Sequence, residues 1–263
     1  MLFAAFSVSF VAAALLSSRV LPSRVFARGH PTPPLAAYLS APMAALPSAL
    51  DVGRLVPLSD TDADTRWAPV LRATVARKAP SQKAAPVGQL PRLTPDGTTN
   101  IVVADGEAVV NGATWVRVGL SVLPNDTDGW VPRSSLGGWS FVATRLVIDR
   151  ARFTATLYRG GRAIFRAPVG VGATGTPTPA GQFYVRDRLT GFSSAMYGPL
   201  AFGTNARSPT LTDWPAGGVV GIHGTDQPNL IPGRISHGCI RLTNAAILNL
   251  GKLMPIGTPV TIE

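Results

Sequence analysis

Short runs of alternating apolar and polar residues, separated by turn residues, fill the segment from about residue 66 to residue 140. Between Trp67 and Gly138 they include Ile101-Val102-Val103, Trp115-Val116-Arg117-Val118 and Gly129-Trp130-Val131-Pro132. About five short strands at this spacing are typical of a small β-barrel. We therefore predict a small barrel over residues 66–140.

The alternation becomes stronger from Thr144 onward. The segments 154–159 and 162–169 flank the pair Gly160-Gly161, and two such runs around a Gly-Gly pair predict a β-hairpin. The chain ends in a further apolar alternation over residues 259–262, which predicts a last strand.

One helix is expected near the C-terminus. Thr243 can serve as its N-cap, the apolar residues Ile247, Leu250 and Met254 follow at helical spacing, and Pro255 ends the pattern. The expected fold class is therefore mostly β, with two successive β-rich domains and a short C-terminal helix.

The first 65 residues differ from the rest. Residues 2–16 are nearly all apolar or small, and Val25-Phe26-Ala27 resembles a small-x-small cleavage site. We predict that residues 1–28 are a signal peptide or an N-terminal anchor, in which residues 2–16 would tether the protein to a membrane. Residues 29–65 are rich in Pro and Ala and predict an extended linker. The protein is therefore expected to be exported from the cytoplasm.

Composition supports this picture. Apolar residues make up 46% of the chain and charged residues 14%, with 27 Gly and 24 Pro, a balance that favours short strands and turns. The net charge is +10, but the basic residues are dispersed and form no run typical of a nucleic-acid-binding arm. We expect no nucleic-acid partner; the charge indicates either a solvated basic surface or attraction to an anionic cell wall.

The single cysteine, Cys239, excludes an internal disulfide in a chain that we expect to be exported. A thiol attacks as its thiolate, and its ordinary pKa of about 8.5 leaves only a small charged fraction at neutral pH. A nucleophilic Cys239 therefore needs a neighbouring base that keeps the sulfur charged. His223 and His237 are the candidates, because His30 lies in the linker.

His223 follows the apolar run 219–222, at the end of an expected buried strand, which suits a rigid general base. No carboxylate is an obvious partner, so we expect a backbone carbonyl to orient the imidazole ring. Gly238 predicts a tight bend, and the backbone amides of Gly238 and Cys239 suit an oxyanion hole.

Two alternatives to a nucleophilic cysteine are open at this point. A lone cysteine is commonly an inert core residue. Alternatively, His223, His237 and Cys239 are ligand types that zinc accepts, although their spacing matches no standard zinc signature.

Two resemblances to known families add to these observations. The strings His-Gly-Thr at 223–225 and Ser-His-Gly-Cys-Ile-Arg-Leu at 236–242 resemble the L,D-transpeptidase (YkuD) catalytic domain, as does the stretch 176–181. The likeness extends from about Thr144 to Glu263, which would assign residues 141–263 to this domain. The segment 114–132 resembles a bacterial SH3-like domain, which would assign residues 66–140 to a wall-binding or spacer module. The alternative for this segment is that its tryptophans are simply core residues.

The L,D-transpeptidase resemblance implies a cysteine acyltransferase that needs no cofactor and no metal. It assigns Cys239 as nucleophile and His223 as proton acceptor and donor. The residues implied around the substrate and the oxyanion are these: Gly224, Ser236, His237, Gly238 and Arg241.

The same resemblance implies a substrate and a reaction. Cys239 would form a thioester with a peptidoglycan stem peptide and pass the acyl group to an amine, forming a 3→3 cross-link or attaching a protein to the wall. Two alternatives use the same partner: an L,D-carboxypeptidase or endopeptidase that hydrolyses the stem, and a non-catalytic wall-binding protein. The acceptor amine stays open.

Overall fold

The computed structural model describes residues 55–59, 64–191, 193–211 and 218–263. All of these residues belong to one compact unit, which spans residues 47–263. The predicted signal peptide or anchor, its tether at residues 2–16 and most of the predicted linker lie outside the described residues. Within the described ranges, no helix is long and apolar enough to cross a membrane.

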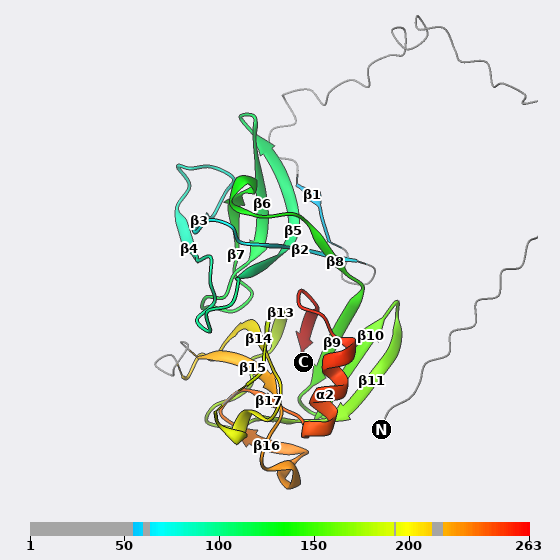
Figure 1. Cartoon of the computed structure of the whole chain (residues 1–263). Helices are drawn as coiled ribbons and strands as arrows, with labels where there is room; N and C mark the ends of the chain where they lie inside the picture. Colours follow the sequence, from blue (N-terminus) through cyan, green and yellow to red (C-terminus); the bar gives the residue numbers. More distant parts are fainter. Residues whose placement is uncertain (1–54, 60–63, 192, 212–217) are drawn as a thin grey trace, which may run out of the picture. The chain divides into compact units, whose positions relative to one another are not determined.

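Strands dominate the described part of the chain (Figure 1). A first sheet has eight strands in the order β4-β3-β7-β6-β5-β2-β8, with β1 paired to β5. Its elements are β1 (Val56–Pro57), β2 (Thr65–Pro69), β3 (Thr74–Arg77), β4 (Pro86–Leu90), β5 (Ile101–Val110), β6 (Ala113–Gly119), β7 (Asp128–Pro132), the 3₁₀ helix η1 (Arg133–Ser135) and β8 (Ser140–Val142).

A second sheet has ten strands in the order β11-β10-β9-β18-β13-β14-β15-β17-β12-β16. Its strands are β9 (Thr144–Asp149), β10 (Thr154–Arg159), β11 (Arg162–Pro168), β12 (Gly170–Gly172), β13 (Gly181–Leu189), β14 (Ala201–Arg207), β15 (Val219–His223), β16 (Gly233–Ser236), β17 (Ile240–Arg241) and β18 (Pro259–Ile262). The helices of this region are η2 (Ala195–Tyr197), η3 (Pro228–Leu230) and α2 (Asn244–Leu253).

The mostly β fold class and the short C-terminal helix are thus confirmed. Each sheet has its own apolar core, formed by the inward-facing residues of its strands. In the first sheet Trp115 is buried and Trp130 is partly buried, so both contribute to packing. The resemblance of this region to an SH3-like domain, and the domain bounds at 66–140 and 141–263, stay predictions.

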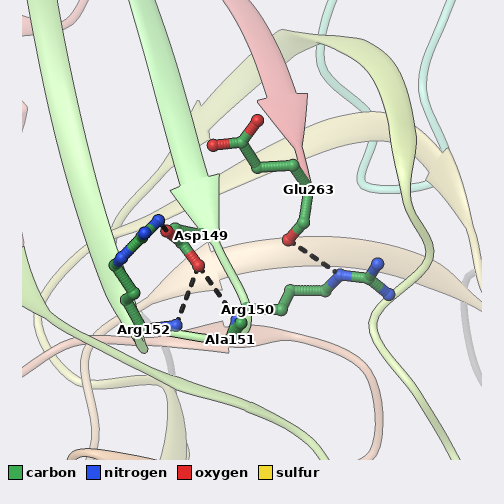
Figure 2. Close-up of polar contacts among 5 residues, drawn as sticks. All are labelled: Asp149, Arg150, Ala151, Arg152 and Glu263. Atoms are coloured by element: carbon green, nitrogen blue, oxygen red, sulfur yellow. Dashed lines mark hydrogen bonds and ion pairs between the residues drawn. The ribbon is translucent and has the colours of Figure 1, made fainter.

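The predicted hairpin is present, because β10 and β11 pair antiparallel around Gly160-Gly161. The preceding turn, between β9 and β10, is fixed by Asp149, whose Oδ1 accepts hydrogen bonds from the amides of Ala151 and Arg152 at 3.0 and 2.8 Å. Arg150 donates from Nε to the backbone carbonyl of Glu263 at 3.1 Å, as Figure 2 shows. These contacts fix the end of the chain beside β9.

The helix α2 begins as the sequence predicts. The side chain of Thr243 accepts a hydrogen bond from the amide of Ala246 at 3.3 Å and so satisfies an N-terminal amide of the helix. Ile247 and Leu250 are fully buried in the core of the second sheet, and Met254 follows at the C-cap. The apolar face of the helix therefore covers that core.

Candidate active site

The site is built where β15 and β17 pair in parallel, with Ile222 opposite Ile240 and His223 opposite Arg241. This pairing brings Cys239, just before β17, alongside Gly221 in β15. The amide of Gly221 donates a hydrogen bond to Cys239 Sγ at 3.4 Å. Residues that are far apart in the sequence thus meet at the same point of the sheet.

Cys239 and His223 lie on the same side of β15. A Cβ atom built at Gly221 would lie 3.9 Å from Cys239 Sγ and 3.9 Å from His223 Cδ2. His223 is two residues after Gly221, so alternation along the strand directs both positions to the same face. Cys239 as a residue is partly exposed, and its side chain and that of His223 line the same cavity.

The imidazole of His223 is fixed by a backbone carbonyl. Its Nδ1 lies 2.6 Å from the carbonyl oxygen of Gly224. A carbonyl oxygen only accepts, so Nδ1 carries the hydrogen and Nε2 keeps its lone pair. The ring of Tyr197 packs edge-on against the imidazole with 5.1 Å between the ring centroids. His223 is therefore held as a neutral base.

Burial keeps both groups uncharged. Desolvation lowers the pKa of His223 from 6.5 to about 4, against the opposing effect of the Gly224 hydrogen bond, and the charge of Arg241 lowers it further. Desolvation raises the pKa of the Cys239 thiol, although the Gly221 amide and Arg241 act in the opposite direction. At neutral pH the resting pair is a thiol and an imidazole. This differs from the charged sulfur that we expected from the sequence, because burial disfavours the ionised forms.

Ser236 and Gly238 shape the turn before the cysteine. The Ser236 hydroxyl donates to the backbone carbonyl of Cys239 at 2.5 Å and accepts from the amide of Gly238 at 3.1 Å. Gly238 has a φ of 117°, a conformation that favours glycine. In this conformation the Gly238 amide is already engaged, and Ser236 stabilises the turn. The amide of Cys239 is the better candidate for the oxyanion donor.

Thr178 is a positioning residue that the sequence did not reveal. It is buried, and its hydroxyl accepts from the amide of Gly172 and donates to the carbonyl of Gly238, both at 2.8 Å. The turn before Cys239 is thereby tied to the segment after β12. Thr178 lies in the 176–181 stretch, which also resembles the family motif, but only the fold brings it to Gly238.

Gly224 and Asn244 form a second support. A Cβ atom built at Gly224 would lie 2.4 Å from Asn244 Oδ1 and 3.0 Å from Gly198 Cα, which leaves no room for a side chain. The same Asn244 oxygen accepts a hydrogen bond from the amide of Thr225 at 2.9 Å. Gly224 thus permits close packing and supplies the carbonyl that orients His223. Asn244 was not among the residues predicted from the sequence.

The cavity beside this pair has a volume of about 120 Å³. His237 is exposed at its edge, and Arg241 lines it as a buried residue with 8% of its surface exposed. The Nε atom of Arg241 is buried and has no hydrogen-bond partner. The cavity therefore combines a thiol, a neutral base and an unsatisfied cationic donor.

The zinc alternative has no support in this geometry. His223, His237 and Cys239 do not converge into a group that could hold a metal ion, nor do other sets of His, Cys, Asp and Glu within the described ranges.

Residues 143–262 match the family model of the L,D-transpeptidase catalytic domain (YkuD). The resemblance that the motifs indicated is confirmed for this part of the chain. The match begins at residue 143 and does not include the first sheet.

Particular relatives are found in two Bacillus species. The YkuD protein of Bacillus subtilis is 37% identical over 112 residues, which are 42% of this chain and 60% of the relative. Its counterpart in Bacillus licheniformis is 33% identical over 118 residues, covering 45% of this chain and 64% of the relative. The chain thus spans less than two thirds of the length of each.

Among solved structures, the catalytic domain of the Enterococcus faecium L,D-transpeptidase is 27% identical, covering 46% of this chain and 96% of that one, with a TM-score of 0.35.

Proposed function

We propose that this protein is an exported L,D-transpeptidase that acts on peptidoglycan stem peptides through a thioester on Cys239. The observation that supports this most directly is the placement of Cys239 and His223 on the same face of β15, around Gly221. The family match supports the reaction class. The products would be 3→3 cross-links or proteins attached to the wall.

The first half-reaction starts from the neutral pair. Nε2 of His223 accepts the Cys239 proton as the sulfur attacks the carbonyl carbon of the third stem residue. The amide of Cys239 stabilises the oxygen of the tetrahedral intermediate. The bond to the terminal D-alanine then breaks, the imidazolium returns its proton to the leaving amine, and a thioester remains.

The second half-reaction reverses these roles. The acceptor amine attacks the thioester carbonyl and gives a proton to His223, and Cys239 leaves and takes that proton back as a thiol. Arg241 is suited to hold an oxygen of the donor stem, because its buried Nε has no partner within the described residues. Its charge also opposes protonation of His223.

Transfer and hydrolysis are separated by the fate of the acyl group. The protein is incubated with a tetrapeptide stem, with and without a second stem as the amine, and the products are weighed by mass spectrometry. Transfer predicts a dimer that has lost one D-alanine. Tripeptide alone would instead identify a carboxypeptidase or endopeptidase.

The role of His223 is tested by its rate of acylation with a carbapenem, which mimics the acyl donor of this family. We expect a mass increase on Cys239, no increase in Cys239→Ala, and a far larger loss of rate in His223→Ala than in His237→Ala. His237 is a matched control, because it lines the same cavity but is exposed. Equal losses would refute the assignment of the base.

The wall-binding alternative is tested with the same variant. If the protein forms neither dimer nor tripeptide and Cys239→Ala binds isolated walls as well as the wild type, the chain is a binding protein. The mature N-terminus of the exported protein, measured by mass, reports whether residues 1–28 are removed.

A further inference from the structure

A second cavity lies within the unit formed by residues 47–263. Its volume is about 300 Å³, larger than that beside Cys239, and the two cavities share none of their lining residues. The lining includes Asn100 and Ser121 from the first sheet region and Arg186 and Arg207 from β13 and β14. The proposed acyl transfer uses none of these residues.

Arg186 is the unusual member of this lining. Only 4% of its surface is exposed, and its Nε and Nη2 atoms are both buried without a hydrogen-bond partner. These two nitrogens form one edge of the guanidinium, which can donate two parallel hydrogen bonds to a single oxyanion. A buried cation with an unsatisfied donor edge is costly unless an anion or water meets it.

A second cation lies close to the first. Arg207 Nε donates to the carbonyl and the hydroxyl of Ser121 at 3.0 and 3.2 Å. Burial lowers the pKa of Arg207, and the charge of Arg186 lowers it further, so the two guanidinium groups repel each other. The cavity lining contains no acidic residue. Arg186 and Arg207 are therefore the charged residues of this lining.

The neighbouring carboxylates do not pair with Arg186. Asp187 accepts from the amide of Gly203 at 2.9 Å and from the hydroxyl of Thr98 at 3.2 Å. Asp96 is close enough to Arg186 for its pKa to be affected, but it is exposed. Among the described residues, neither forms an ion pair with Arg186.

An unsatisfied acceptor lies in the same lining. Asn100 is buried, and its Nδ2 donates to the carbonyl of Pro91 at 2.8 Å, which fixes the orientation of the amide. Its Oδ1 has no partner. A ligand that satisfies this cavity must therefore offer negatively charged oxygens to Arg186 and one hydrogen-bond donor to Asn100.

We propose that this cavity is a phosphate site, which takes hydrogen phosphate or a phosphate monoester on the Nε–Nη2 edge of Arg186, beside Arg207. Hydrogen phosphate carries both charged oxygens and a hydroxyl, so it can also donate to Asn100 Oδ1; a monoester has that hydroxyl only in its singly protonated form, since its second pKa is about 6. Sulfate has the same shape but no hydroxyl and should bind more weakly.

The site is tested by calorimetric titration of the full chain at constant ionic strength, with chloride as the background anion. The probes are inorganic phosphate, glycerol 3-phosphate and sulfate; the first two distinguish free phosphate from a monoester. We expect hydrogen phosphate, which keeps a hydroxyl at neutral pH, to bind more tightly than sulfate. Arg186→Met should weaken binding at least about tenfold, since a charge-assisted bidentate contact is lost.

Two control variants localise the binding. Arg188→Met alters an exposed arginine of the same strand, and Arg241→Met removes the unsatisfied arginine beside Cys239. Both should keep the phosphate affinity of the wild type. Loss of binding in Arg241→Met would place the anion beside Cys239 and overturn the proposal, as would equal affinities of wild type and Arg186→Met.

A measurement on the wild type covers the case in which Arg186→Met does not fold. The Nε–H resonance of Arg186, identified by its loss in Arg186→Lys, should shift on addition of phosphate. A resonance that does not move at saturating phosphate would refute the site. Failure of acyl transfer by Cys239 would leave this result unchanged, because the two cavities share no lining residue.

Discussion

Acidification should destabilise this fold through His223. The unfolded chain binds a proton at the imidazole with a pKa of 6.5, whereas the folded protein does so only at about 4. Between these values the unfolded state binds more protons, so the free energy of unfolding falls as the pH falls. The stability is fully present above pH 6.5 and is lost as the pH approaches 4.

The magnitude follows from the shift. Each pKa unit corresponds to about 1.4 kcal/mol, so the full difference is roughly 3 kcal/mol. Between about pH 7.5 and about pH 5 the expected loss is about 2 kcal/mol. Only 3% of the surface of His223 is exposed, so solvent screening reduces this value little.

Urea unfolding at both pH values, followed by tryptophan fluorescence, measures the effect in the wild type and in His223→Gln. The difference between the two proteins isolates the histidine from other titrating groups. Asp105 requires this subtraction, because burial raises its pKa to about 6 and its contribution to stability grows as the pH falls. Parallel pH dependences in wild type and His223→Gln would refute the account of a histidine held neutral by burial.

Three further predictions concern positioning and packing. Thr178→Val removes the buried hydrogen bonds to Gly172 and Gly238, so it should lower the free energy of unfolding by about 2 kcal/mol and slow acylation of the cysteine. Thr178→Ser keeps the hydroxyl and should retain the wild-type stability and acylation rate. Urea unfolding and acylation rates measure these effects. Thr243→Ala removes the cap of α2 and should cost about 1 kcal/mol in urea unfolding with acylation unchanged; a slower acylation rate would contradict a purely local role. Phe202 is fully buried, and Phe202→Ala should cost roughly 3–5 kcal/mol, so a loss below about 1 kcal/mol would contradict the packing described.

Several features of the site were predictable because their signals are local. The Ser-His-Gly-Cys string marks the turn before Cys239, and the apolar run before His223 marks a strand that ends at this histidine. Other features were not. The Gly238 amide donates to the Ser236 hydroxyl, and the Thr178 hydroxyl donates to the carbonyl of Gly238, which lies 60 residues further along the chain. Such partners depend on which strands become neighbours, and the local patterns of a single sequence do not show which strands will pair.

The sequence by itself determined many of the elements and the candidate site residues. Alternation indicated the strands, Gly160-Gly161 indicated a hairpin and Thr243 indicated the start of α2, because each of these signals depends on a few adjacent residues. One short motif also contains the only cysteine of the sequence. Only the tertiary structure decided how those residues act. The parallel pairing of β15 and β17 brings Cys239 to His223, and burial leaves this pair neutral and leaves Arg186 without a partner. Charge and pairing depend on the surroundings of a side chain, which exist only once distant strands have packed together.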